Sequence, residues 1–161
     1  MLERDYKTVR IEGLAGAGWH FDLDLPLTAQ IETATQTDSD TAPSATLSKI
    51  RMVESGARID VVGLRLTGHA DVASWLDEWL EQLGMTPISS RPRATQHGVM
   101  GDILATKRTK DGVTVARYAT VRDRERTFVL VLRAPLANYR LVAQDFVLAV
   151  SSFRASNDSV A

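Results

Sequence analysis

Residues 101–153, GDILATKRTKDGVTVARYATVRDRERTFVLVLRAPLANYRLVAQDFVLAVSSF, decide the fold of this chain. They contain three strand-like segments followed by one long amphipathic segment, and Asp111-Gly112 separates the first two strands. Asp-Gly between two extended runs indicates a tight hairpin, because the turn requires a positive φ that glycine adopts without a steric clash. We therefore predict a β-meander closed by a C-terminal helix.

The third strand of this meander is the predicted centre of the sheet. Residues 126–134 (RTFVLVLRA) contain five consecutive apolar residues, a run that is typical of a strand covered on both faces. Pro135 ends the strand because proline cannot donate a ladder hydrogen bond. Apolar residues then recur at helical spacing over residues 139–153, with Asn138 as the predicted N-cap. We expect this helix to lie on the sheet and its loss to unfold the domain.

The earlier part of the chain predicts four more strands and one more helix. The strands are expected at residues 6–11, 19–25, 47–54 and 58–66. Asp71 is the predicted N-cap of a helix whose apolar stripe covers residues 72–83 and which Gly84 terminates. Trp75 and Trp79 belong to this stripe, which favours packing in the core over an aromatic platform for bases or sugars.

Three segments are predicted to lie outside regular elements. Residues 28–46 are rich in Thr, Ala, Ser and Asp and contain only Ile31 as a large apolar residue, which predicts a long flexible loop. Residues 85–99 contain two prolines and are predicted to be irregular or edge-like. Residues 156–161 are a predicted disordered tail.

These elements predict one α+β domain over residues 1–161. Its order of strands and helices indicates an antiparallel or mixed sheet of six to seven strands with helices packed on it, an α/β/α sandwich. A chain of 161 residues is long enough to bury a core without disulfide bonds.

The composition of the chain limits the chemistry that its side chains can perform and the cellular locations to be expected. The absence of cysteine excludes disulfides, thiolate nucleophiles and Cys-ligated zinc from the sequence given. The first residues lack a signal-peptide pattern, and no run approaches the roughly 18 apolar residues of a membrane span. As written, the protein is expected to be soluble and cytoplasmic, with a cell-envelope location if an N-terminal leader was removed.

No catalytic constellation stands out. Asp22 and Asp24 would share one face of a strand, as a metal site requires, but the apolar residues that alternate with them favour a solvated face. The glycine-rich residues 13–18 lack the lysine and the following helix of a phosphate loop. Three histidines have no partner at ligand spacing: His20, His69 and His97. We therefore predict a protein that is not an enzyme and has no metal and no cofactor.

Charge is distributed unevenly along the chain. Residues 1–90 contain 7 Lys and Arg against 14 Asp and Glu, whereas residues 91–140 contain 11 against 4. Within the basic part, Arg122, Arg124 and Arg126 belong to one predicted meander turn. We take these three arginines as the candidate partner-binding residues, because such a cluster attracts acidic surfaces. The alternative is that neighbouring carboxylates neutralise them within the fold.

The predicted partner of this basic part is another protein with an acidic surface, or a second copy of the chain. Tyr118 is the only aromatic residue in the first two predicted strands of the meander, residues 102–109 and 113–121, whereas proteins that bind single-stranded nucleic acid need several stacking rings. Nucleic acid is therefore a disfavoured partner.

The order of elements resembles the PsbP-like fold, an α/β/α sandwich that is shared by DcrB-related bacterial proteins. The matching residues are Phe21–Pro26 (FDLDLP), Gly101 at the start of the meander, and residues 139–153 at its end. The sequence departs from the family pattern because no Gly-Trp follows Pro26 and residues 28–46 form a long insertion. The resemblance implies a noncatalytic protein-binding or accessory module, chaperone-like in some members, and it supplies no catalytic residues.

Two functional hypotheses follow. The first is this noncatalytic binding module, and the alternative is a small-ligand-binding or hydrolytic α+β domain with a pocket under the first helix. A deep pocket lined by His97, Asp22 or Asp24 would favour the alternative. A filled core with an apolar or charged open face would favour the binding module.

Overall fold

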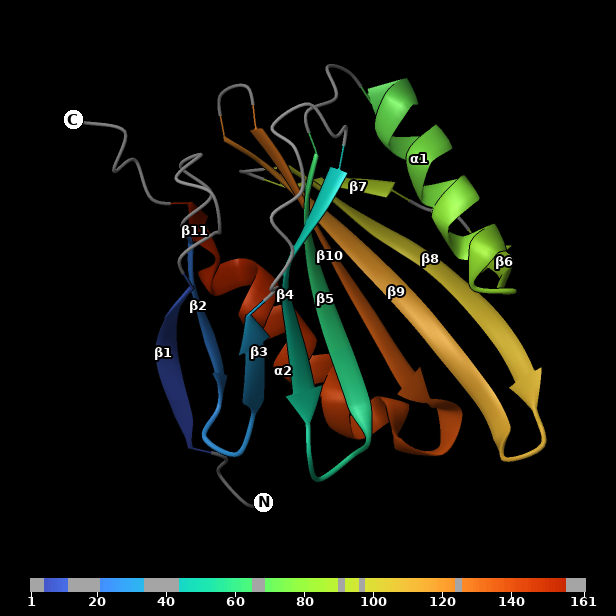
Figure 1. Ribbon diagram of the computed structural model, residues 1–161, viewed down its shortest axis with the longest axis horizontal. Coiled ribbons are helices and arrows are strands. Elements are labelled where there is room, and N and C mark those ends of the chain that lie inside the picture. The colour runs from blue at the N-terminus through green and yellow to red at the C-terminus, as the bar shows by residue number, and fades with distance from the viewer. Residues whose placement is uncertain are drawn as a thin grey trace.

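The computed structural model describes residues 5–11, 21–33, 44–64, 69–89, 92–95, 98–123 and 126–155. In these residues the chain forms two antiparallel sheets and two α-helices, an α+β fold (Figure 1). The smaller sheet has the strand order β1-β2-β11. Its strands are β1 (Tyr6–Ile11), β2 (Phe21–Pro26) and β11 (Arg154–Ala155).

The larger sheet has eight strands in the order β3-β4-β5-β10-β9-β8-β6, with β7 paired to β8. Its strands are β3 (Gln30–Thr33), β4 (Ser44–Met52), β5 (Ala57–Leu64), β6 (Thr86–Ser89), β7 (Pro92–Thr95), β8 (Gly98–Thr109), β9 (Gly112–Asp123) and β10 (Arg126–Pro135). The helices are α1 (His69–Gln82), the 3₁₀ helix η2 (Leu136–Asn138) and α2 (Tyr139–Ser152). The predicted meander is therefore confirmed as β8-β9-β10, and β10 lies in the interior of the sheet between β5 and β9.

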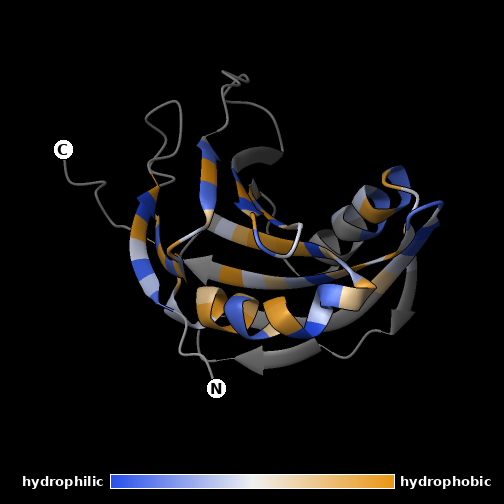
Figure 2. Ribbon diagram, turned by 90° about the horizontal axis from the view of Figure 1, so that it is seen from below, coloured by the Kyte–Doolittle hydropathy of each residue, from blue (hydrophilic) through white to orange (hydrophobic). Residues whose placement is uncertain are grey.

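Alternate residues of β10 face two different cores. Phe128, Leu130 and Leu132 face the first core, which also contains Phe146 of α2 and Phe21 of β2. Both α2 and the smaller sheet therefore cover this face of the larger sheet. Figure 2 shows apolar and polar residues alternating along α2, as expected for a helix that rests on a sheet.

The opposite face carries a second and smaller core. Val129 and Val131 of β10 contact it, together with the buried Leu80 of α1. Figure 1 shows α1 near β8 and β6, away from β3 and β4. The part of this face that is formed by β3, β4 and the start of β5 is therefore not covered by a helix in the described structure. No helix in the described part of the chain is long and apolar enough to cross a membrane.

The prediction of one sheet is wrong, because the strands divide between two sheets. The hairpin of β1 and β2 pairs with β11, where Arg154 lies opposite Asp22 and Ala155 opposite Phe21. A strand of two residues that directly follows a helix has no periodicity of its own. The sequence therefore could not indicate the second sheet.

The predicted loop at residues 28–46 is also wrong in part. Residues Gln30–Thr33 form β3, and β4 begins at Ser44. Ile31 lies opposite Ile50 of β4 and packs against the first core, so both the pairing with β4 and this contact hold the strand in place. Threonine and isoleucine also favour extended structure. The remaining residues of this prediction, 34–43, lie outside the described residues.

The segment 85–99 is more regular than predicted. It contains β6 and β7, both paired with β8, so the expectation of irregular structure is wrong and that of edge strands is right. Pro87 is tolerated because β6 is the last strand of the sheet and proline is compatible with an edge. The predicted tail at residues 156–161 lies outside the described residues.

The helix starts differ from the capping predictions. Helix α1 begins at His69, two residues before the predicted N-cap Asp71. Asn138 occupies the N-cap position of α2 but makes no capping hydrogen bond. Its Nδ2 instead donates to the backbone oxygen of Ser55 at 2.9 Å, which ties the start of α2 to the turn between β4 and β5.

We expect Gly112→Ala to lower the free energy of unfolding by about 1 to 3 kcal/mol. Gly112 has a φ of 125°, a conformation that residues with a Cβ rarely adopt, and it closes the hairpin between β8 and β9. Denaturant melts would measure the loss. Lys110→Ala in the same turn is the control, since Lys110 is exposed. A loss no larger than that of the control would show that the turn tolerates a side chain.

Candidate functional site

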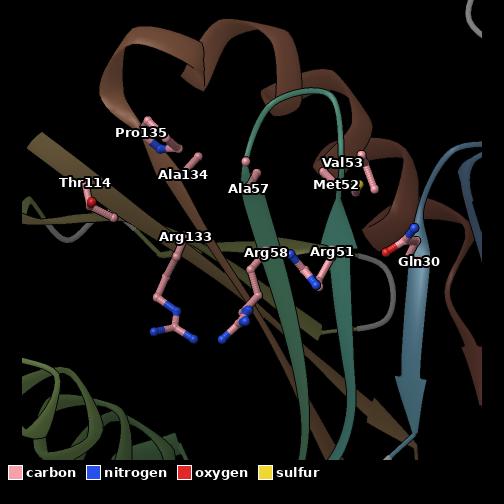
Figure 3. Close-up of a pocket in the computed structure, with 11 residues that line it drawn as sticks. Gln30, Arg51, Met52, Val53, Ala57, Arg58, Thr114, Arg133, Ala134 and Pro135 are labelled. Carbon is pink, nitrogen blue, oxygen red and sulfur yellow. The ribbon is translucent and has the colours of Figure 1, made fainter. Parts of the chain in front are cut away.

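A hollow of about 410 Å³ opens at one end of the larger sheet, where the turn between β4 and β5 meets the end of β10. Arg51, Arg58 and Arg133 line it, and we call it the arginine groove after these three residues. Figure 3 shows the side chains of Arg58 and Arg133 extending in the same direction from their strands, with Arg51 alongside. The groove thus gathers three guanidinium groups that belong to three strands.

Strand register explains this row of arginines. Arg51 lies opposite Arg58 across β4 and β5, and Arg58 lies opposite Arg133 across β5 and β10. Residues directly opposite each other point to the same face of a sheet, and neighbouring strands are about 4.8 Å apart. Like charges in such positions destabilise the sheet. The row therefore creates a positive potential that favours a bound anion.

The three arginines differ in how their charges are balanced. Arg133 Nη2 donates to Oδ2 of the buried Asp60 at 2.7 Å. Arg51 Nη1 lies 4.0 Å from Glu32 Oε1, and both side chains are more than half exposed, so this pair contributes little. Arg58 has no carboxylate partner among the residues that the structure describes. It is therefore the arginine whose charge the described residues leave unbalanced.

Helix α1 helps to position Arg133. The Arg133 guanidinium lies 5.8 Å from the centroid of the Trp79 ring, and Trp79 stacks on Trp75 at 5.8 Å with an interplanar angle of 16°. Both tryptophans are half-buried and pack against the second core. The predicted packing of the two rings is confirmed, but they border the core instead of filling it. Trp79 and Asp60 together limit the freedom of Arg133.

The Asp60–Arg133 pair is not fully satisfied. Asp60 Oδ1 and Arg133 Nε are both buried, and neither atom has a hydrogen-bond partner among the residues that the structure describes. Among the described residues, the one hydrogen bond to this carboxylate is therefore the charge-assisted bond from Arg133 Nη2 to Oδ2. Further along this face, burial and, to a lesser extent, the charge of Asp77 raise the pKa of Tyr118. Tyr118 is therefore protonated at neutral pH and adds no charge to the face.

The basic turn predicted from the sequence is a different site. Arg124 lies outside the described residues, and only the backbone is described for Arg122 and Arg126, at the β9–β10 hairpin. Arg126 and Arg133 mark opposite parts of β10, about 23 Å apart at the usual rise of a strand. The role of these three turn arginines stays a prediction.

Sequence reasoning missed the arginine groove. Its three members are scattered along the chain, and two of them lie in the part with an acidic excess. The signal that reveals them is the pairing of β4, β5 and β10, which sets Arg51, Arg58 and Arg133 in one row.

The carboxylates considered from the sequence do not line the groove. Asp24 Oδ1 accepts a hydrogen bond from Thr8 Oγ1 at 2.7 Å across β1 and β2, and Asp22 is half-buried on the same strand. His20 and His97 lie outside the described residues, as does the side chain of His69. Among the described residues, no three His, Cys, Asp or Glu residues gather as metal ligands. The groove is lined by strand and turn residues and does not lie beneath α1.

The fold can be compared with solved structures. Cyanobacterial PsbP (CyanoP) from Synechocystis sp. PCC 6803 matches with a TM-score of 0.65 over 96% of this chain and 94% of its own, at 12% sequence identity. The fold is PsbP-like. LpqN, a Mycobacterium tuberculosis protein involved in cell envelope biogenesis, matches with a TM-score of 0.54 over 92% of this chain and 90% of its own, also at 12% identity. The sequence itself matches no family model and no curated protein.

These comparisons confirm the PsbP-like resemblance at the level of the fold. Sequence identities of 12% carry no residue roles from either structure to this chain. The relation to DcrB-related proteins stays a prediction.

Proposed function

We propose that this PsbP-like chain is a noncatalytic accessory module that docks an acidic surface of another protein through its arginine groove. The observation that carries the proposal is the row of Arg51, Arg58 and Arg133 in a groove whose lining includes no described residue of α1. Positive charges arranged in this way orient encounters with an acidic partner and speed association.

The chemistry of the groove supports binding over catalysis. Guanidinium groups stay protonated in proteins, so they bind anions but do not exchange protons as general acids or bases. The described lining consists otherwise of apolar residues, glycine, Gln30 and Thr114, without a group that titrates near neutral pH. A noncatalytic role therefore accounts for every polar group that is placed there.

A second candidate function is binding of a small organic anion. The groove volume of about 410 Å³ falls within the usual range for small-molecule pockets, roughly 300 to 1,000 Å³. This candidate retains the ligand-binding hypothesis from the sequence but moves its site from the first helix to the strand ends. The α/β/α layering and the two locations considered, the cytoplasm and the cell envelope, stay predictions.

The proposal is tested with two charge-reversal variants and a fluorescent peptide of ten glutamates as the probe. We expect the groove variant, Arg51→Glu with Arg58→Glu, to bind the peptide at least about tenfold more weakly than the wild type. The turn variant, with Arg122, Arg124 and Arg126 replaced by Glu, tests the site predicted from the sequence. Binding by the wild type should weaken as salt rises, because exposed charges are screened over about 8 Å at physiological salt.

Arg140→Glu is the control, since Arg140 is an exposed residue of α2, which covers the other face of the sheet. Thermal melts of each variant would show that the fold is retained. Loss of binding in the turn variant alone would assign the acidic partner to the turn instead of the groove. Equal and salt-independent binding by all variants would contradict the proposal.

A further inference from the structure

The three arginines of the groove are not equivalent as ligand contacts. Arg133 is already paired with Asp60 and lies against Trp79. Arg51 is more than half exposed and lies 4.0 Å from Glu32. Arg58 sits between them, is half-buried, and has no carboxylate partner among the described residues. A new anion would therefore gain most from contact with Arg58.

The surroundings of Arg58 strengthen such a contact. A half-buried charge is screened less by salt than an exposed one. The planar guanidinium presents a fork of donors that matches the two oxygens of a carboxylate. The positive charge of Arg58 itself favours the ionised form of a bound carboxylic acid. The donor geometry and the positive charge of Arg58 are thus both suited to binding a carboxylate.

The other end of the groove is apolar. Val53, Ala134 and Pro135 line it, and Figure 3 shows Pro135 and Val53 apart from the ends of the Arg58 and Arg133 side chains. Val53 is 56% exposed, and the adjoining Leu136 is 54% exposed. A ligand that fills the groove would therefore combine a negative group with an apolar group.

We propose that Arg58 is the specificity-determining residue of the groove and that its guanidinium binds one carboxylate of the partner. An apolar side chain close to that carboxylate in the partner packs against Val53 and Pro135. This inference rests on the proposed docking function and names its ligand chemistry, an acidic residue followed closely by an apolar one. In an extended peptide, side chains two positions apart point to the same side at about 6.6 Å, a spacing that lets both enter one groove.

The number of unbalanced charges favours a carboxylate over a phosphate group. Arg133 is neutralised by Asp60, and Arg51 is an exposed rim residue, so a single half-buried guanidinium remains for the ligand. One guanidinium matches the single charge of a carboxylate. A phosphate group carries a charge of about −1.5 to −2 at neutral pH and would need a second unpaired cation.

The test uses Arg58→Lys, which keeps the charge and removes the fork. The probe is a fluorescent peptide with Glu and Leu two positions apart, and anisotropy is measured at about 0.15 M salt. We expect Arg58→Lys to weaken binding about tenfold, because a point charge does not replace a bidentate contact. Arg140→Lys is the matched control on α2 and should bind as the wild type does.

Two further peptides test the ligand chemistry. A peptide with Gly in place of Leu should bind more weakly, and equal binding would overturn the apolar contact. A peptide with phosphoserine in place of Glu should bind no more tightly than the Glu peptide. Tighter binding of the phosphopeptide would overturn the assignment of a carboxylate.

The outcomes separate this inference from the proposed function. If Arg58→Lys binds like the wild type while the double charge reversal at Arg51 and Arg58 still abolishes binding, the receptor role of Arg58 is overturned and acidic docking stands. If no acidic peptide binds the wild-type protein, both the docking function and the receptor role are overturned. If Arg140→Lys also lost binding, the effect of replacing arginine by lysine would not be specific to the groove. This result would also overturn the assignment of Arg58.

Discussion

Phe146→Ala is expected to lower the free energy of unfolding by about 3 to 5 kcal/mol. Phe146 lies in α2, is completely buried, and belongs to the first core between α2 and the larger sheet. Its ring also lies 5.9 Å from the guanidinium of Arg117. Truncation would leave a cavity that the sheet and helix cannot close, because α2 is also tied to β2 by the hydrogen bond from Asp24 N to Ser152 Oγ at 2.8 Å.

Urea melts of Phe146→Ala and Leu141→Ala would measure this effect. Leu141 lies on the same helix but is 57% exposed, so its truncation should change the free energy of unfolding by less than about 0.5 kcal/mol. A loss below about 1 kcal/mol for Phe146→Ala would contradict the placement of α2 on the sheet. The comparison within one helix separates core packing from helix propensity, since alanine is the best helix former in both positions.

Asp60→Ala is expected to lower the free energy of unfolding by about 2 to 4 kcal/mol. Asp60 is buried and accepts the hydrogen bond from Arg133, which lies in the same row as Arg58. Its removal leaves a partly buried guanidinium without its counter-charge beside a second arginine. Because the Arg133 side chain is 25% exposed, water offsets part of the loss.

The matched control is Glu32→Ala, which removes the carboxylate from the exposed pair with Arg51. This change should cost about 0 to 1 kcal/mol, because both side chains are in water. The double replacement Asp60→Leu with Arg133→Met should recover much of the loss, since an apolar pair of similar volume replaces a buried ion pair well. Equal losses of unfolding free energy for Asp60→Ala and Glu32→Ala would show that Asp60 does not balance the charge of Arg133.

Local signals predicted the second half of the fold. The turn at Gly112, the apolar run in β10 and the stop at Pro135 each depend on neighbouring residues, and all three agree with the structure. The helical spacing that predicted α2 also selected the buried Val142, Phe146 and Phe153. Such features are readable because the backbone requirements of a turn, a covered strand and an amphipathic helix are set by the sequence around them.

The short strands with weak sequence signals form because neighbouring strands pair with them. β3 contains one large apolar residue, β7 has four residues and β11 has two, so none of them shows a convincing alternation. Each becomes a strand because an adjacent strand offers unpaired backbone groups in register. The division of the strands into two sheets follows from the same long-range pairing, which is why a single sheet was the wrong prediction.

By itself the sequence determined the meander, the closing helix, the absence of cysteine chemistry and an excess of positive charge in residues 91–140. It did not determine where an anion would bind. Arg51 and Arg58 lie in the part of the chain that carries an acidic excess, and Arg133 lies far from both in sequence. Only the tertiary structure placed them in one row, because the register across β4, β5 and β10 sets residues opposite each other whatever their distance along the chain.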